Sequence, residues 1–419
     1  MKPSAQNTLP PSLPPLYRNN SLIAALGPLL SGEEFATRLA HLPPRPDKET
    51  TNNPAWALHS LSLIDDIHLP CPSGQALAST VDLMIRTGYR YRNPSEPGTW
   101  SSWYADTPTI MSHNAPIIGS LGGVSGMGKT KSLTRALKLQ SQTILHNNFP
   151  NLVGPLKSIS WIIADVPASG QLSDLSLELM RLTDLLLGTD EFKNDLTKDR
   201  RAGMRLFDRW IHRVRRHFLG ILVLEEIQNF FKIPSLKERL RSAKLPIHER
   251  PLLKVADDNT LKAILTLSNW GVPILFSGTP DGMQAFSSRM SIAQRLVGQG
   301  HLWLQPPETA DDEFFKAFID TLFIYQYLPI KLKFNADLRK KLFDMSGGVR
   351  RICIYLWRLG QRVAIENESK EFKFEHIQQA LNTYLAPLKP AIAALRSDDP
   401  NKLKRYEDLL PPSDFFHLL

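Results

Sequence analysis

The chain has 419 residues, of which 42% are hydrophobic and 22% charged, and a formal net charge of +9. This composition can supply apolar cores for about two or three domains and excludes a wholly disordered chain. No run approaches the ~20 apolar residues that span a bilayer, and no basic-then-apolar leader opens the chain, so we expect a soluble cytoplasmic protein. Cys71 and Cys353 form no CxxC pattern, which indicates neither a disulfide framework nor a zinc site. The positive charge is typical of proteins with polyanionic partners, and equally of basic soluble proteins.

Proline clusters interrupt the first hundred residues. Residues 1–20 are predicted to form a flexible Pro-rich arm. Three segments then show the apolar spacing of helices: 31–42, 56–67 and 75–87. Residues 88–107, rich in Tyr, Trp, Arg, Pro and Ser, are predicted as a loop. We therefore expect a helical N-terminal region over residues 21–107.

Apolar runs of strand length alternate with helical patterns over residues 108–308. The predicted strands are 117–122, 157–166, 219–224, 272–277 and 301–304. Strands separated by helices form parallel βαβ crossovers. The fold class is therefore predicted as α/β, with a five-stranded parallel sheet flanked by helices on both faces.

The loop that follows the first of these strands has a phosphate-binding pattern. Residues 123–130 fit GxxxxGK[ST], and a helix is predicted over 131–145. Its glycines let backbone N–H groups converge on phosphate oxygens, and the helix adds its positive N-terminus. Lys129 is predicted to contact the β- and γ-phosphates and Thr130 to ligate Mg²⁺. The predicted ATP-binding residues of this loop are Gly123, Ser125, Gly126, Met127, Gly128, Lys129 and Thr130; a chance match is the alternative.

Two carboxylates, Glu225 and Glu226, directly follow the strand 219–224. P-loop ATPases place an acidic metal partner and a catalytic base at this position. Glu225 is therefore the predicted metal ligand, and Glu226 the residue that orients and deprotonates the attacking water. The usual first residue is Asp, so Glu225 is one methylene longer, which leaves the metal geometry open. Alternatively, the two carboxylates only favour the start of a helix.

The strand 272–277 ends in Ser277, with Thr279 two residues later. Since parallel strands end at the same sheet edge, a hydroxyl here can sense the γ-phosphate and position water. Ser277 is thus a predicted nucleotide contact, with a plain turn residue as the alternative.

Strand signals stop after residue 308. Four helical patterns follow, at 311–323, 335–345, 349–365 and 374–385, and predict a helical lid over residues 309–386. The tail, residues 387–419, ends in an apolar stretch that is predicted to dock into a partner or to pack on the lid.

The pieces in this order resemble the AAA+ ATPases and, within them, the TnsC/TniB transposition regulators. The resemblance depends on the continuation Glu225-Glu226-Ile227-Gln228 and on the later Gly278-Thr279-Pro280, and it covers about residues 117–386. Family members typically carry Asp-Glu-Ile-Gln, so Glu225 departs from the pattern. The resemblance implies an AAA+ core over residues 108–308. It also implies a homo-oligomeric ring or filament that assembles with ATP on double-stranded DNA and bridges a target-selector protein to a transposase.

The resemblance also implies roles for two arginines. In AAA+ proteins an arginine late in the helix before the last strand reaches the neighbouring subunit's γ-phosphate. Arg295 lies at that place, with Arg289 as the competing candidate and an exposed helix arginine as the alternative. In the lid, Gly347-Gly-Val-Arg350 resembles the Gly-x-x-Arg that opens a lid helix and points at the nucleotide, which favours Arg350 over Arg351.

A basic segment between the Glu226 and Ser277 strands is the candidate DNA contact, because loops from this part of the fold commonly face the channel of a ring. Its residues are Lys232, Lys237, Arg239, Arg241 and Lys244. Phosphate contacts carry no sequence information, so the choice of target would fall to a partner. A solvated helical face is the alternative.

The predicted function is that of an ATP-dependent DNA-binding regulator of transposition, which hydrolyses ATP to disassemble or proofread its complex. Three rivals remain: an AAA+ replication initiator or helicase loader, a STAND-type signalling ATPase and a small-molecule kinase. Residues 387–419 are too few for the winged-helix domain that would favour an initiator, and we find no repeat array of the kind that follows a STAND core.

Overall fold

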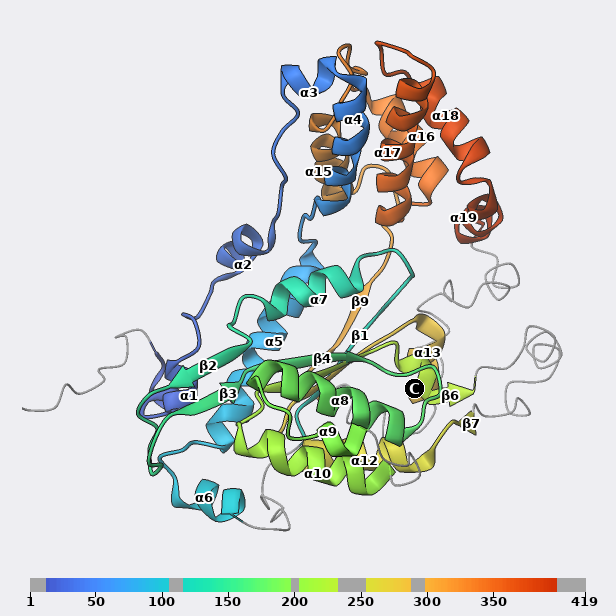
Figure 1. The fold of residues 1–419 in the computed structure, drawn as a ribbon. Coiled ribbons are helices and arrows are strands. Elements are labelled where there is room, and N and C mark those ends of the chain that lie inside the picture. Colours follow the sequence, from blue (N-terminus) through green and yellow to red (C-terminus); the bar gives the residue numbers. More distant parts are fainter. Residues whose placement is uncertain (1–12, 105–115, 197–202, 233–253, 288–297, 398–419) are drawn as a thin grey trace, which may run out of the picture.

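The computed structural model describes residues 13–104, 116–196, 203–232, 254–287 and 298–397 (Figure 1). Five parallel strands form its central sheet, in the order β4-β5-β8-β1-β9. Their bounds are β1 Ile118–Gly123, β4 Trp161–Asp165, β5 Ile221–Glu225, β8 Ile274–Ser277 and β9 His301–Leu304. The predicted five-stranded parallel sheet is confirmed. Because β1 lies between β8 and β9, with β5 beyond β8, the loop after β1 begins close to the ends of β5 and β8.

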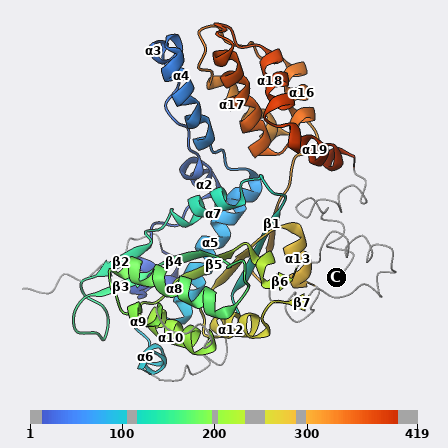
Figure 2. The same ribbon diagram turned by 45° about the vertical axis from the view of Figure 1, so that its right-hand side comes forward.

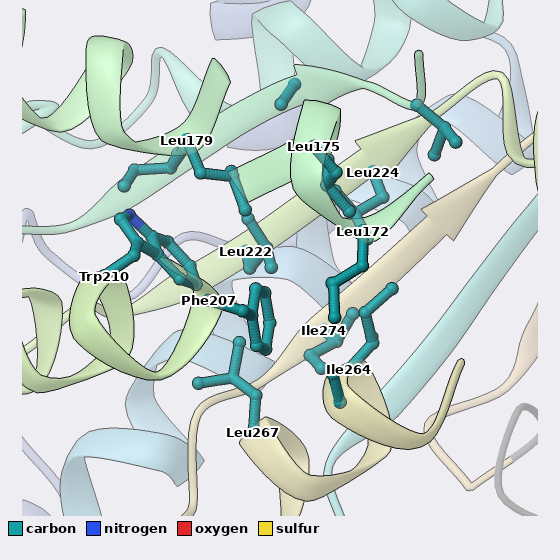
Figure 3. Close-up of a cluster of buried hydrophobic side chains, with 14 of the residues drawn as sticks. Leu172, Leu175, Leu179, Phe207, Trp210, Leu222, Leu224, Ile264, Leu267 and Ile274 are labelled. Atoms are coloured by element: carbon teal, nitrogen blue, oxygen red, sulfur yellow. The ribbon is translucent and has the colours of Figure 1, made fainter. Parts of the chain in front are cut away.

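The sheet is buried on both faces. Successive side chains of a strand point to opposite faces, and Leu222 and Leu224 of β5 contribute to one core while Ile221 and Val223 contribute to the other. Helices α8 (Leu172–Leu187), α10 (Gly203–Arg216) and α12 (Asp258–Asn269) pack on the first of these faces and contribute to its core (Figure 3). Helices α5 (Pro72–Tyr91) and α7 (Lys129–Leu137) cover the second face.

The N-terminal region divides between the sheet and the lid. The lid helices are α15 (Glu313–Ile324), α16 (Ala336–Ser346), α17 (Arg350–Glu366), α18 (Phe374–Thr383) and α19 (Lys389–Arg396), with η5 (Ala386–Leu388) before the last. Ala57, Leu61 and Ile64 are buried in the lid's own apolar core. They belong to α4 (Pro54–Ser60) and the 3-10 helix η2 (Leu61–Asp66), which contact α17 (Figures 1 and 2). By contrast α5, which follows, packs on the sheet.

Several local predictions are wrong. Residues 88–91 continue α5 and residues 97–104 form α6, where the sequence predicts a loop. Helix α7 ends at Leu137, and residues 143–145 of the predicted helix belong instead to β2 (Thr143–His146), which pairs antiparallel with β3 (Leu156–Ile159). The predicted strand 157–166 is two strands, because the chain leaves β3 and enters the main sheet after Ser160. Apolar runs of this length do not distinguish helix from strand by periodicity.

Short elements complete the described chain. They are η1 (Pro15–Tyr17), α1 (Ser21–Ala24), α2 (Gly32–Leu39), α3 (Lys48–Asn52), α6 (Pro97–Tyr104), β2 (Thr143–His146), β3 (Leu156–Ile159), α9 (Lys193–Leu196), η3 (Ile227–Phe230), β6 (Phe231–Lys232), β7 (Lys254–Val255) and α13 (Pro280–Ser287). None of the helices in these described ranges has the length and apolarity that a membrane crossing requires.

Candidate functional site

A cavity of about 860 Å³ opens between the sheet edge, α7, the lid and the segment after η2. Nine of the predicted site residues line it: Ser125, Gly126, Gly128, Lys129, Thr130, Glu225, Glu226, Ser277 and Arg350. They come from segments that are up to about two hundred residues apart in the chain, so the fold gathers them in one place.

The glycine loop shapes one wall of the cavity. Gly126 (φ +84°) and Gly128 (φ +86°) are left-handed, and Gly128 is the N-cap of α7. This conformation favours glycine, and the loop leads into the positive N-terminus of a helix. The side chain of Lys129 folds back, and its Nζ donates to the carbonyl of Gly123 at 2.7 Å.

Two predicted loop residues do not line the cavity. Gly123 (φ +151°) ends β1 so close to β9 that a Cβ there would lie 2.2 Å from the carbonyl oxygen of Leu304. Met127 is buried in the core beneath the loop. Gly123 and Met127 therefore support the loop, while the other predicted loop residues line the cavity.

Three oxygen-bearing side chains meet at the sheet edge. Thr130 Oγ1 donates to Glu225 Oε1 at 2.8 Å, and Ser277 Oγ donates to the same oxygen at 3.5 Å. Burial raises the pKa of the Glu225 carboxyl; the Thr130 hydrogen bond opposes this shift, and the charges of Asp165 and Glu226 add to it. The group is thus a buried carboxylate with hydroxyls on one oxygen, held beside a lysine.

This donor set fits Mg²⁺ only in combination with a phosphate ligand. No group of three or more His, Cys, Asp or Glu residues in the described ranges is arranged to hold a metal ion. Mg²⁺ is commonly bound by one or two protein oxygens together with substrate phosphates and water. Thr130 and Glu225 are the residues that would hold it here.

Glu226 has an unusual backbone and a close side-chain partner. It adopts φ +55° and ψ 40°, a left-handed conformation that is uncommon outside glycine. Its exposed carboxylate accepts a hydrogen bond from Gln228 Nε2, and Gln228 Oε1 accepts from the backbone N–H of Thr279 at 3.4 Å. The sequence marked Gln228 only as part of a family pattern and did not predict this contact.

The lid closes directly on the glycine loop. The N–H of Arg351 donates to the carbonyl of Gly126 at 3.1 Å. Arg350 is buried, its Nη2 donates to Cys71 Sγ at 3.2 Å, and its guanidinium lies over the ring of Phe314. Both arginines line the cavity, so their positions do not show whether Arg350 or Arg351 contacts the nucleotide.

Two buried polar atoms in the lining have no hydrogen-bond partner among the described residues. They are Arg350 Nε and Thr279 Oγ1. Because an unpaired buried polar atom costs roughly 1–3 kcal/mol, such atoms often mark a missing ligand. A phosphate-bearing ligand would satisfy both a guanidinium and a hydroxyl.

The cavity is rich in cations that the motifs did not identify. Its further basic residues are Arg38, Lys131, Arg135, Lys138, Arg351 and Arg358, against a single further carboxylate, Asp65. Arg358 pairs with Asp65, and Lys131 donates to the carbonyl of Ile67. Burial lowers the pKa of His68 to about 3, so this residue is neutral near pH 7. The i, i+4 spacing of Lys131 and Arg135 after the motif could have indicated the basic wall; the Asp65 and His68 contacts had no local signal.

Other predicted residues lie outside the described part of the chain. They are Arg289, Arg295, Lys237, Arg239, Arg241, Lys244 and the apolar end of the tail. Lys232 ends β6, which pairs with β7.

Comparison with known proteins agrees with this architecture. Residues 114–285 match the family model of an AAA domain. The chain has the AAA+ P-loop ATPase fold, a five-stranded parallel sheet flanked by helices with a helical C-terminal region. No curated relative matches the sequence.

Among solved structures, the chain is similar to the Aeropyrum pernix ORC1 protein in complex with DNA. That match has 14% identity and a TM-score of 0.42, and covers 83% of this chain and 73% of the other. The structure of Drosophila ORC bound to DNA matches with 13% identity, a TM-score of 0.42, and coverage of 95% and 88%. Likeness at this level carries no information about function.

Proposed function

We propose that this protein binds ATP with Mg²⁺ in the cavity between the glycine loop and the lid, and hydrolyses it. The observation that carries the proposal is the meeting of Thr130, Glu225 and Ser277 beside Lys129, at the edge where the loop, β5 and β8 end. The excess of cations in the lining supports a polyanionic ligand.

Each residue of the site would have its own role in ATP hydrolysis. The Lys129 ammonium would leave its carbonyl partner and neutralise charge on the β- and γ-phosphates, and Arg350 would contact the γ-phosphate from the lid. Glu226 would accept the proton of the attacking water, whose oxygen forms the new bond to phosphorus as the bond to ADP breaks. Thr130 and Glu225 would hold Mg²⁺, which would supply neutralisation of the negative charge on the phosphates.

We further propose that ATP binding makes copies of this protein assemble on duplex DNA. The assembly would regulate transposition by bridging a target-selector protein to a transposase. Its support is the family pattern: Ile227 and Gln228 of the first motif pack against Gly278 of the second. The net charge of +9 suits a DNA partner. In this proposal Arg295, or Arg289, completes a neighbouring subunit's site, the basic residues 232–244 track the DNA backbone, and the C-terminal tail contacts the transposase.

The test compares wild type with Lys129→Ala and Glu226→Gln. ATP turnover is measured, and particles are imaged by negative stain with duplex DNA, with and without a non-hydrolysable ATP analogue. Wild type should form rings or filaments only with nucleotide, Lys129→Ala should form none, and Glu226→Gln should form stable ones with ATP. A monomer without DNA affinity at low salt would refute the assembly proposal, and absence of ATP turnover by wild type with DNA would refute the enzymatic one.

The rival functions separate by partner. A replication initiator or helicase loader would capture a helicase component on DNA, and a STAND-type ATPase would assemble with ATP in the absence of DNA. A transposition regulator should stimulate strand transfer by its transposase only when ATP and DNA are both present.

A further inference from the structure

Gln228 joins the predicted catalytic base to the end of a different strand. It belongs to η3, two residues after Glu226, and it lines the nucleotide cavity. Its Nε2 donates to Glu226 Oε2, while its Oε1 accepts from the N–H of Thr279, which follows β8. One side chain therefore spans from the end of β5 to the end of β8.

Close packing leaves this bridge little room to rearrange. A Cβ at Gly278 would lie 2.5 Å from Ile227 Cγ1 and 3.1 Å from Gln228 Oε1. A Cβ at Gly282 would lie 2.9 Å from Gln228 Cβ and 3.0 Å from its backbone nitrogen. Because real Cβ contacts almost never fall below 3 Å, both positions suit only glycine, and they let α13 and the end of β8 approach η3.

Within the described ranges, the Glu226 carboxylate accepts no side-chain hydrogen bond besides the one from Gln228. Its side chain is exposed, and a glutamate has several rotatable bonds whose freedom must be restricted for a base to act in one geometry. An amide N–H that donates to a carboxylate oxygen fixes the direction in which that carboxylate points. The second carboxylate oxygen stays available for water.

We propose that Gln228 is a positioning residue for ATP hydrolysis. It holds the Glu226 carboxylate toward the attacking water and ties it to the Ser277 to Thr279 strand end, where the γ-phosphate is expected. This inference rests on the proposed function of the site. It deepens that function by making the geometry of the base depend on a strand end that contacts the substrate.

The experiment uses two variants of the full-length protein. Gln228→Glu is nearly isosteric but removes the amide donor and places a negative charge beside Glu226. Gln228→Leu removes donor and acceptor together. Gln379→Leu is the matched control, since Gln379 is an exposed lid glutamine whose side chain accepts a hydrogen bond from Asn367 and lies outside the nucleotide cavity.

We measure kcat and KM for ATP from pH 5 to 9, and the Kd of a fluorescent ATP analogue. A positioned general base contributes roughly 100- to 10,000-fold, so partial loss should lower kcat about 10- to 100-fold in both variants, with KM and Kd changed less than about 3-fold. A purely structural role would instead raise KM and Kd or weaken folding, without a selective loss of kcat.

The outcomes of the inference and of the proposed function are distinguishable. If wild type hydrolyses ATP and Glu226→Gln does not, a Gln228→Glu protein with wild-type kcat overturns the inference alone. A kcat above wild type would overturn it too, because Gln228 would then restrain the base. If Glu226→Gln is as active as wild type, the assignment of the base fails and the proposed mechanism with it.

Discussion

Replacing Asp82 by alanine should destabilise the nucleotide-free protein severely. Asp82 and Arg86 lie on α5, where Arg86 Nε donates to Asp82 Oδ2 at 2.8 Å and the Arg86 side chain is only 1% exposed. The same network continues to other elements: Arg86 Nη2 donates to the carbonyl of Gly27 at 2.6 Å, and Gln140 Nε2 donates to Asp82 Oδ1 at 3.0 Å. It thus connects α5 to the N-terminal segment and to the chain just after the nucleotide-binding helix.

The loss of stability in Asp82→Ala is estimated from the Arg86 charge that would remain buried without its partner. Removing one partner of a buried ion pair leaves an uncompensated charge and costs about 3–5 kcal/mol. Domains of ordinary stability have only about 5–15 kcal/mol in total. With a urea m-value of about 3 kcal/mol per molar, the midpoint of unfolding should fall by about 1–1.7 M.

The assay is urea unfolding followed by tryptophan fluorescence and circular dichroism. The double variant Asp82→Leu, Arg86→Met removes both charges and should recover most of the loss, since apolar replacement of a whole buried pair is often neutral or stabilising. An Asp82→Ala loss below about 1 kcal/mol, or a double variant as unstable as the single one, would show that the network does not support this face of the sheet.

Three further substitutions test the cavity and the strand β1 that leads into its glycine loop. Burial raises the pKa of the Glu225 carboxyl above its ordinary value of 4.5. The ionised carboxylate therefore destabilises the folded protein at a pH above the raised pKa, and has no such effect below pH 4.5. Glu225→Gln should accordingly raise the melting temperature at pH 8 but not at pH 4. The same variant should lose the stabilisation that Mg²⁺ and ATP give wild type, about 2.7 kcal/mol at 100 times Kd. Gly123→Ala should cost more than about 2 kcal/mol in urea unfolding, because its Cβ would lie 2.2 Å from the Leu304 carbonyl oxygen. Arg358→Ala should leave stability within about 1 kcal/mol, since its pair with Asp65 is partly exposed, while fluorescence titration shows weaker ATP binding by about 3- to 10-fold.

Local sequence patterns were enough to predict a five-stranded parallel sheet and the phosphate loop. The inner strands β5 and β8 are short, mainly apolar runs because parallel strands are buried on both faces, and that signal is local. The loop from Gly123 to Thr130 is contiguous, so its glycines and its lysine appear together in the chain. The rule that parallel strands end at one edge was enough to bring Glu225 and Ser277 to the loop.

The contacts by which distant segments complete the cavity are seen only in the tertiary structure. Cys71 contacts Arg350, Asp65 contacts Arg358, and Gln228 contacts Thr279. These residues lie far apart in the chain, and the periodicity of the sequence does not predict such contacts. The division of the N-terminal region is of the same kind: α4 and α5 both have apolar faces, and a face does not say which core will bury it. The sheet and the lid both have an apolar surface that could bury such a helix. Helix α5 packs on the sheet and α4 on the lid because of where these surfaces lie in the folded chain.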